Sequence, residues 1–292
     1  MKILLFSRAG IRHSADEVRR IFAAAEKCGF SVAVNEEFAP VAETLTGVSI
    51  PAEARYGSRV EPAGEESVML CYGGDGTLLE GAARLDGAPV PVAGINSGRL
   101  GFLTSAPERG IEDIFESIRT RTLRIEERSM LAASGGFESG GGVRYALNEI
   151  SVQRAGATMI SVEVRVDGEP VATCHGDGTV ISTPTGSTAY SLSAGGPVVA
   201  PQCRCLVISP VAPHNLTMRP VVVPDDSRIS LRLLSSAEKA FCSADNRSER
   251  LLPNAEIEIA RADRRIFLVV PHNISFYDTL RNKMMWGLDA RG

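Results

Sequence analysis

Apolar positions in the first 124 residues follow two alternating spacings. Short, nearly continuous apolar runs such as 67–73 are typical of parallel strands covered on both faces. Between these runs, apolar residues such as Val18, Ile21 and Ala25 recur every three to four positions, which predicts helices. We predict strands at 2–6, 31–38, 67–73 and 90–96, and helices at 14–28, 77–87 and 105–121.

Helix start signals support this assignment. Ser14 followed by Glu17, and Ser105 followed by Glu108, each fit a capping box. Alternating strands and helices predict a doubly wound α/β domain, in which ligands bind at the carboxyl ends of the strands. Residues 46–66 have no clear period and carry Gly and Pro, so we expect an irregular or mobile insertion there.

The pattern changes near residue 125. From there to residue 270, short runs of alternating apolar and polar residues are separated by Gly, Pro, Asn and Asp, which predicts an all-β second domain. After residue 270 the helical spacing returns, and Ser275 with Asp278 fits a helix cap. We expect this terminal helix to pack back on the first domain.

Composition and charge narrow the class of protein. The 292 residues, 44% hydrophobic and 23% charged, are typical of a soluble globular protein. A net charge of −4 argues against a general binder of nucleic acid or anionic membranes, which would carry a basic excess. The first apolar run ends at Ser7, so we expect a strand rather than a signal peptide or membrane span.

The six cysteines include no C-x-x-C pair. Reduced thiols in a cytoplasmic protein are the simplest interpretation. A zinc site at Cys203 and Cys205 is the alternative to two inert thiols in a strand-like stretch.

Asp75 lies in a glycine-rich stretch, GGDGT at 73–77. Glycine-rich loops often cradle phosphate, but two like charges ~4 Å apart repel by about 4 kcal/mol at an effective dielectric of 20. No P-loop lysine follows, and a dinucleotide fingerprint would need glycine where Leu79 stands. Asp75 therefore fits a site where a metal ion neutralises the phosphate, or a general base for a hydroxyl that attacks phosphorus. The alternative is an ordinary Asx-turn.

A second polar cluster occupies 183–197, TPTGSTAYSLSAGGP. Its concentration of hydroxyls and glycines suits a large polar ligand with an aromatic face, and a polar loop between strands is the alternative. Asn148 and Glu149 place an amide beside a carboxylate at the start of a predicted strand. An ionised carboxylate can accept both hydroxyls of a ribose, although such pairs also occur on ordinary protein surfaces.

Taken together, these motifs resemble the NAD kinase family. The motifs that follow its order and approximate spacing are GGDGT, 94–104 (GINSGRLGFLT), Asn148-Glu149, Asp177, 183–197, 212–224 and the terminal FYDTLRNKMMWG. The GGDGT stretch is shared with diacylglycerol and sphingosine-type lipid kinases, whereas the 183–197 string is highly specific. The resemblance covers essentially the whole chain outside 46–66.

The resemblance implies a fold and a reaction. The fold is α/β plus all-β, with a Rossmann-like first domain, 1–124 completed by 271–292, and a β-rich, β-sandwich-like second domain, 125–270. NAD would bind between the two domains. The reaction is transfer of the terminal phosphoryl group of ATP, or of inorganic polyphosphate, to the 2′-hydroxyl of the adenosine ribose. We expect a divalent metal ion, Mg²⁺ delivered with ATP, a cytoplasmic homodimer or homotetramer, and neither nucleic acid nor membrane as a partner.

The resemblance also implies roles for individual residues. Asp75 matches the proposed catalytic base, and the positions that match the phosphate-binding loop are Gly73, Gly74, Gly76 and Thr77. The positions that match NAD-binding residues are Asp75, Gly76, Asn148, Glu149, His175, Asp177, Thr188, Ala189, Tyr190, Ser191, Ser193, Ala212 and Asn246. Asn148 and Glu149 match positions that hold adenosine, and Asp177 matches one on the nicotinamide half.

Two positions depart from the family pattern. His175 stands where relatives often carry a basic residue, so a charge there would depend on pH near 6.5. Asn246 lies in a segment that varies among relatives, around an aspartate. Two other functions stay open at this point: a lipid kinase that shares the GGDGT stretch, and a catalytically silent NAD(P)-binding protein.

Overall fold

The chain divides into two compact units. The computed structural model describes residues 1–60, 66–96, 101–104, 107–234, 239–270 and 275–287, with backbone alone over 107–109. Unit 1 is Met1–Glu127 with Ile266–Gly292, and unit 2 is Arg128–Arg265. The chain leaves unit 1 within strand β6 (Arg124–Ser134) and re-enters it within strand β17 (Glu256–Val270).

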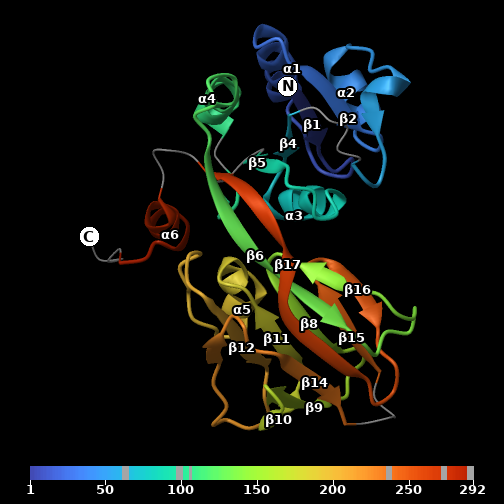
Figure 1. Cartoon of the computed structure of the whole chain (residues 1–292), viewed down its shortest axis with the longest axis vertical. Helices are drawn as coiled ribbons and strands as arrows, with labels where there is room; N and C mark the ends of the chain where they lie inside the picture. The colour runs from blue at the N-terminus through green and yellow to red at the C-terminus, as the bar shows by residue number, and fades with distance from the viewer. Residues whose placement is uncertain (61–65, 97–100, 105–106, 235–238, 271–274, 288–292) are drawn as a thin grey trace. The chain divides into compact units, whose positions relative to one another are not determined.

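Unit 1 is built on a parallel sheet (Figure 1). Its strands are β1 (Lys2–Phe6), β2 (Ser31–Asn35), β3 (Arg55–Tyr56), β4 (Ser67–Tyr72), β5 (Pro91–Ile95) and the end of β17. They lie in the order β3-β2-β1-β4-β5-β17, and each neighbouring pair is parallel. An order that runs outwards in both directions from the first strand is typical of Rossmann-like domains, so the predicted fold of this part is confirmed.

Helices cover both faces of this sheet. The covering helices are α1 (Ala15–Lys27), α2 (Ala39–Thr46), α3 (Asp75–Arg84) and α4 (Pro107–Arg119). Helix α6 (Phe276–Met284) also belongs to this unit. On one face, Leu5 and Leu70 join a buried cluster with Ile21 of α1 and Phe115 of α4. On the other face, Gly81 lets α3 approach so closely that a β-carbon there would lie 2.5 Å from the sulfur of Cys71. Side chains alternate along each strand, so both faces are filled.

The helix caps differ in detail from the predicted boxes. The hydroxyl of Ser14 accepts the backbone N–H of Glu17, as predicted, but the carboxylate of Glu17 accepts the hydroxyl of Tyr72 at 2.5 Å. The phenol of Tyr72 in turn accepts the backbone N–H of Ser14 at 3.1 Å, so a tyrosine bridges the two ends of the box. At α6 both bonds of the box between Ser275 and Asp278 are present. The box predicted at Ser105 lies outside the described residues.

The prediction of an irregular insertion at 46–66 was wrong in part. Strand β3 lies within it and pairs with β2 at the edge of the sheet. Arg55 bonds the carboxylate of Glu43 at 3.0 Å, and the hydroxyl of Tyr56 donates to the carbonyl of Leu5 at 3.1 Å. Helix α2, which begins just before this segment with Pro40 in its first turn, was not predicted.

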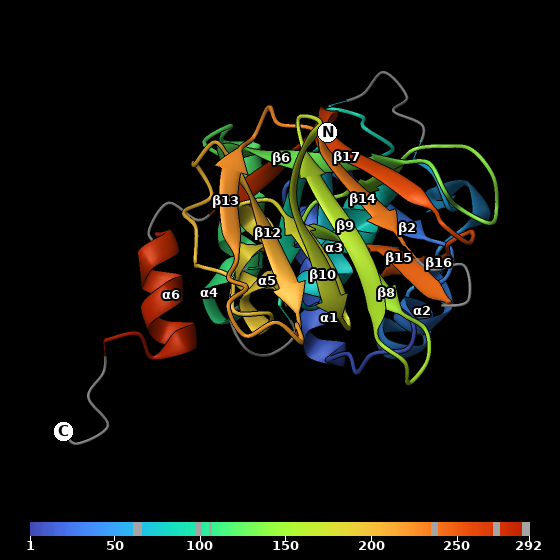
Figure 2. The same ribbon diagram turned by 90° about the horizontal axis from the view of Figure 1, so that it is seen from below.

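Unit 2 consists of two antiparallel sheets. The first contains β10 (Glu169–Gly176), β9 (Ile160–Val166), β14 (Ile229–Leu233), the start of β17, β6 and β7 (Arg144–Ala146). The second has the order β13 (Val221–Pro224), β12 (Cys205–Val211), β11 (Gly178–Ser182), β8 (Glu149–Arg154), β15 (Ala240–Ala244) and β16 (Arg247–Arg250). Figure 2 shows β12 and β13 side by side at one edge of the second sheet.

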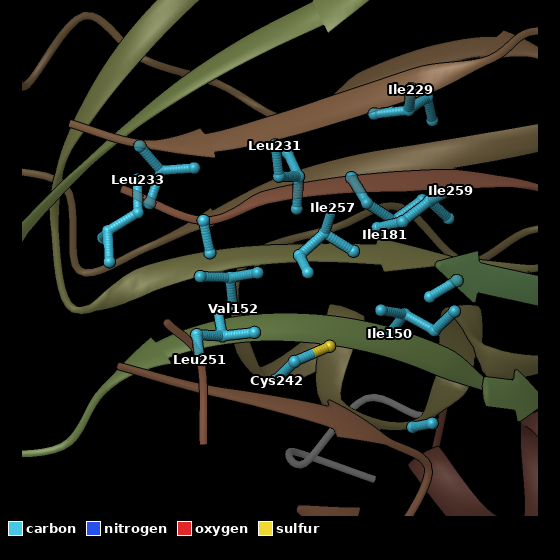
Figure 3. Close-up of a cluster of buried hydrophobic side chains, with 14 of the residues drawn as sticks. Ile150, Val152, Ile181, Ile229, Leu231, Leu233, Cys242, Leu251, Ile257 and Ile259 are labelled. Atoms are coloured by element: carbon cyan, nitrogen blue, oxygen red, sulfur yellow. The ribbon is translucent and has the colours of Figure 1, made fainter. Parts of the chain in front are cut away.

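The core of unit 2 lies between these two sheets (Figure 3). Leu231 and Ile257 come from the first sheet, and Ile150 and Ile181 come from the second. The opposite face of the second sheet is mixed, because the residues that alternate with the core positions include Glu149 and Ser182 as well as the buried Val180 and Val207. The predicted β-sandwich-like second domain is therefore confirmed. Of the helices in the described ranges, none is long and apolar enough to cross a membrane.

Candidate functional site

The GGDGT stretch forms the tight connection between β4 and α3. Gly73 donates its N–H to the carbonyl of Ile95 at 2.8 Å and has a φ of +147°, which other residues rarely adopt. A β-carbon on Gly73 would also lie 2.5 Å from the hydroxyl of Thr77, which is itself buried. Gly74 precedes the helix, and Asp75 is its first residue. The carboxylate therefore stands at the positive end of the α3 dipole.

Three donors orient the carboxylate of Asp75. Oδ1 accepts the N–H of Leu103 at 3.2 Å and the hydroxyl of Thr104 at 2.9 Å. Oδ2 accepts the N–H of Phe102 at 2.8 Å. A carboxylate oxygen accepts about two hydrogen bonds, so Oδ1 is filled and Oδ2 has one remaining lone pair. The side chain of Asp75 is 27% exposed.

A lysine of the terminal helix stands beside the same oxygen. Nζ of Lys283 lies 3.6 Å from Oδ2 of Asp75 and 4.8 Å from the centre of the Phe102 ring. The ring of Phe276 on the same helix lies 6.3 Å from Phe102. The C-terminal helix thus packs on the loop that holds the carboxylate, as expected for a helix that returns to the first domain.

A cavity of about 640 Å³ opens beside the GGDGT loop. Its lining residues are Arg8, Ile11, Arg12, His13, Ser14, Gly74, Gly76 and Thr77. Two guanidinium groups and the start of a helix give this cavity the character of an anion-binding site. Burial lowers the pKa of His13 below its ordinary value, so this imidazole adds no positive charge at neutral pH.

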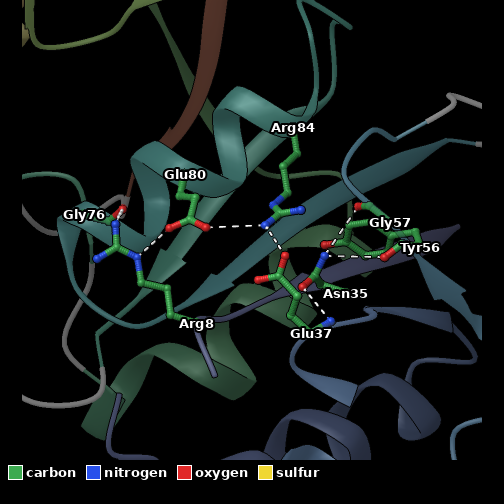
Figure 4. Close-up of polar contacts among 8 residues, drawn as sticks. All are labelled: Arg8, Asn35, Glu37, Tyr56, Gly57, Gly76, Glu80 and Arg84. Carbon is green, nitrogen blue, oxygen red and sulfur yellow. Dashed lines mark hydrogen bonds and ion pairs between the residues drawn. The ribbon is translucent and has the colours of Figure 1, made fainter. Parts of the chain in front are cut away.

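Arg8 is held in this cavity wall by a chain of ion pairs (Figure 4). Its Nη2 donates to the carbonyl of Gly76 at 2.8 Å, and its Nε donates to Glu80 at 2.7 Å. Glu80 also accepts from Arg84, which reaches Glu37 at 3.1 Å. Arg8 follows β1 directly, so it lies at the carboxyl end of a parallel strand, where such folds bind ligands.

In unit 2 the polar string at 183–197 folds against the start of β8. The N–H of Thr183 donates to the carbonyl of Asn148 at 2.9 Å, and a β-carbon on Gly186 would lie 2.0 Å from that carbonyl oxygen. Glycine is therefore required for this approach. The string continues as a 3₁₀ turn (Thr185–Thr188) and the one-turn helix α5 (Tyr190–Ser193).

The predicted NAD-binding residues of the string differ in accessibility. Thr188, Ala189 and Tyr190 are half-buried, and Ser193 is exposed. Ser191 is fully buried, and its hydroxyl lies 3.0 Å from that of Ser209 on β12. The position of Ser191 ties α5 to the second sheet.

Asn148 and Glu149 are buried and incompletely bonded. They are 7% and 9% exposed, and neither Oδ1 of Asn148 nor Oε2 of Glu149 has a hydrogen-bond partner among the described residues. Burial first, and then the nearby Asp245, raises the pKa of Glu149 to about 8. This raised pKa favours the protonated form of Glu149 at neutral pH, whereas the interpretation from sequence used an ionised carboxylate.

The remaining predicted residues lie further along the same unit. Asp177 forms a two-pronged ion pair with Arg154, at 2.6 and 3.4 Å. Asp177 and Glu149 both act on Tyr190, whose pKa is raised by burial and by these two carboxylates. These electrostatic effects on Tyr190 show that Asp177 and Glu149 lie in the same part of unit 2 as the polar string.

His175 is the last residue but one of β10, and Ala212 directly follows the end of β12. Ala212 has a φ of +43°, and its carbonyl oxygen would lie 2.8 Å from a β-carbon on Gly176, next to Asp177. His175 is exposed, and its Nδ1 lies 2.9 Å from the hydroxyl of Ser161. Asn246 is exposed in the turn between β15 and β16.

Comparison with known proteins assigns the family. The model of the ATP-NAD kinase N-terminal domain matches residues 5–122, and the model of the ATP-NAD kinase C-terminal domain matches residues 147–271. The chain belongs to the ATP-NAD kinase family. A curated NAD kinase of Bacteroides fragilis is 36% identical over 292 residues, which is all of both chains. Another, of Cytophaga hutchinsonii, is 39% identical over 229 residues and 78% of each chain.

Solved structures show the same fold. Yeast NADH kinase complexed with NADH has a TM-score of 0.86 at 22% identity, covering 99% of this chain and 89% of that one. An NAD kinase from Archaeoglobus fulgidus in complex with ATP has a TM-score of 0.75 at 26% identity, covering 98% and 99%.

In this member of the ATP-NAD kinase family, sequence reasoning missed several residues that contact the predicted site. Arg8 and Arg12 line the cavity, Lys283 stands beside Asp75, and Asp245 lies beside Glu149. The position of Arg8 at the end of the first strand was a signal that could have been used. No local pattern marks Lys283 or Asp245, because each meets its partner only in the folded chain.

Proposed function

We propose that the chain phosphorylates NAD at the 2′-hydroxyl of its adenosine ribose, with ATP or inorganic polyphosphate as the donor. Membership of the ATP-NAD kinase family supports the reaction class. The structural observation that carries the proposal is Asp75, a glycine-framed carboxylate beside an arginine-lined cavity. The bond between the 2′-oxygen and the terminal phosphorus forms as the bond from phosphorus to the bridging oxygen breaks, and ADP, or polyphosphate shortened by one unit, leaves.

Oδ2 of Asp75 is the proposed base. It keeps one lone pair for the proton of the attacking hydroxyl, while Phe102, Leu103 and Thr104 fix the carboxylate in one orientation. General base catalysis of this kind contributes about 10²- to 10⁴-fold, and alignment of the acceptor contributes further.

The cavity beside the loop is the proposed site of the donor phosphates. Arg8 and Arg12 supply positive charge, and the N-terminus of α3 supplies backbone N–H groups. Within the described ranges, no three His, Cys, Asp or Glu side chains are clustered as metal ligands. In the proposed reaction Mg²⁺ enters with ATP as part of the substrate, where it offsets phosphate charge.

Unit 2 is the proposed binding site for the adenosine half of NAD. The unpartnered oxygen of Asn148 and the carboxyl of Glu149 provide an acceptor and a mainly protonated group, next to the half-buried ring of Tyr190. Asp177 is proposed on the nicotinamide half, following the family pattern. A cytoplasmic homodimer or homotetramer remains part of the proposal.

The test is an assay with NAD, ATP and magnesium, read out by an NADP-specific dehydrogenase. We expect NADP only when all three are present, and replacing ATP by polyphosphate identifies the donor. Phosphorylation of a diacylglycerol or sphingosine in place of NAD would favour the lipid kinase. Binding of NAD without any NADP would favour the silent binding protein.

A further inference from the structure

The turn between β15 and β16 holds the start of β8 in place. Ala244 and Arg247 are paired across the two strands, which leaves Asp245 and Asn246 as a two-residue turn. Asp245 has a φ of +53°, a region that Asp and Asn adopt more readily than most residues. The side chain of Asp245 also has an unusual set of partners.

The carboxylate of Asp245 accepts three successive backbone N–H groups. Oδ2 accepts from Leu147 at 2.9 Å, and Oδ1 accepts from Asn148 at 2.8 Å and from Glu149 at 3.4 Å. The backbone N–H of Asp245 donates in return to the carbonyl of Glu149 at 2.9 Å. Four hydrogen bonds thus connect one turn residue to Leu147, Asn148 and Glu149, at the entry to β8, and bonds to a charged acceptor are stronger than neutral ones.

Two of the residues held by Asp245, Asn148 and Glu149, each have a side-chain oxygen without a hydrogen-bond partner among the described residues. Oδ1 of Asn148 and Oε2 of Glu149 are buried and have no partner in the described part of the chain. Leaving such an atom unpaired is unfavourable, so a ligand that bonds to it gains affinity. The positions of these two side chains then decide how well such a ligand fits.

Asp245 also sets the electrostatic environment of Glu149. The groups that face Glu149 are Asp245 from the β15–β16 turn, the backbone N–H and phenol of Tyr190 from α5, and Ser182 from β11. Arg247 of β16 acts on Asp245. Two buried carboxyls this close do not both ionise readily. Burial raises the pKa of Asp245 as well, but three backbone N–H donors and Arg247 favour its charged form, whereas only the N–H of Tyr190 favours charge on Glu149. The proton is therefore favoured on Glu149.

We propose that Asp245 is a positioning residue for NAD binding: it fixes the backbone of Asn148 and Glu149 and keeps Glu149 protonated, so that Glu149 donates a hydrogen bond to the nucleotide. The inference rests on the proposed binding of NAD by unit 2. It differs from the sequence expectation, in which Glu149 accepts hydroxyls as a carboxylate.

The first test compares Asp245→Asn with Asp167→Asn. Asp167 is a matched control, since it has a φ of +52° in another hairpin turn of unit 2 and its carboxylate accepts one backbone N–H, that of Arg228. Asparagine tolerates this backbone, but its amide nitrogen, in place of Oδ2, cannot accept the N–H of Leu147. We expect Asp245→Asn to weaken NAD binding in a calorimetric titration by about ten- to a hundredfold, with the KM for ATP and the kcat at saturating NAD little changed.

The second test uses pH, which a purely structural role would not affect. Wild-type NAD affinity should fall by about tenfold between pH 7 and pH 9, because the protonated fraction of a group with a pKa of about 8 falls by that factor. Glu149→Gln keeps an N–H donor that cannot ionise. We expect this variant to bind NAD nearly as well as wild type at pH 7 and to show no such fall.

The outcomes separate the inference from the proposed reaction. Equal NAD affinity in Asp245→Asn and Asp167→Asn, or a loss in Glu149→Gln as large as in Glu149→Ala, would overturn the inference even if NADP forms normally. If wild type forms no NADP in the coupled assay but shows the expected pattern of binding, the inference holds and the proposed reaction fails.

Discussion

Gly101 lies so close to Asp75 that a β-carbon at position 101 would be 1.9 Å from Oδ1 of the carboxylate. The same β-carbon would lie 2.3 Å from the hydroxyl of Thr104, which donates to that oxygen. The absence of a side chain at position 101 is therefore what allows the loop to enclose the carboxylate.

Gly101→Ala should displace Asp75 and abolish most turnover. A misplacement of about 1 Å can reduce a rate by about 10²-fold, so we expect NADP formation to fall by about that factor while NAD binding persists. Gly141→Ala is the control, because no atom lies within 4 Å of a β-carbon at that position. Initial rates in the coupled assay provide the measurement, and a fully active Gly101→Ala enzyme would show that the loop contact is not needed.

Asp75→Asn should retain NAD binding and lose most turnover. The amide cannot take up a proton from the attacking hydroxyl, so we expect kcat to fall by about 10²-fold or more. Asp113→Asn, which changes an exposed aspartate of α4 in the same unit, is the control. The melting temperature should be recorded for both, since Asp75 also anchors Phe102 and Leu103. Near-normal kcat in Asp75→Asn would exclude the base role.

Arg8→Met should weaken the use of ATP more than the use of NAD. It removes a guanidinium from the cavity wall, and we expect the KM for ATP to rise by about tenfold, as for a lost charge-assisted hydrogen bond. Arg20→Met removes an arginine of the same unit from an exposed ion pair with Glu112 and should leave both KM values unchanged. Equal effects of Arg8→Met on ATP and NAD would place the donor phosphates elsewhere.

Stability should fall with rising pH because of Glu149. Its pKa is raised from 4.5 to about 8 in the folded chain, so between these values the unfolded chain has released a proton that the folded chain retains. The free energy of unfolding should decrease across this window by about 1.4 kcal/mol per pH unit at most.

The measurement is the urea midpoint of wild type and Glu149→Gln between pH 5 and pH 8. The urea midpoint of Glu149→Gln should rise relative to that of wild type as the pH rises. Glu138→Gln, at an exposed position in unit 2, should follow wild type. Parallel curves for wild type and Glu149→Gln would mean that Glu149 is already ionised at neutral pH.

Local signals in the sequence predicted much of the fold but only part of the site. The helix that begins after Ser14 was predictable, because its cap and its stripe of Val18, Ile21 and Ala25 lie within one short segment. Asp75 was predictable from the glycines around it. Asp245 was not, because it bonds the N–H of Asn148, 97 residues earlier in the chain. The protonation of Glu149 was also hidden, because it depends on burial and on that distant carboxylate.

Strand β17 has a consequence for how the chain is made. Its residues Phe267 and Leu268 complete the parallel sheet of unit 1 beside β5, and they follow all of unit 2 in the sequence. A ribosome therefore releases the last strand of the first unit only after synthesising the whole of the second. We infer that during translation unit 2 can reach its native state first. Until β17 is synthesised, the edge of the Rossmann-like sheet at β5 stays unpaired.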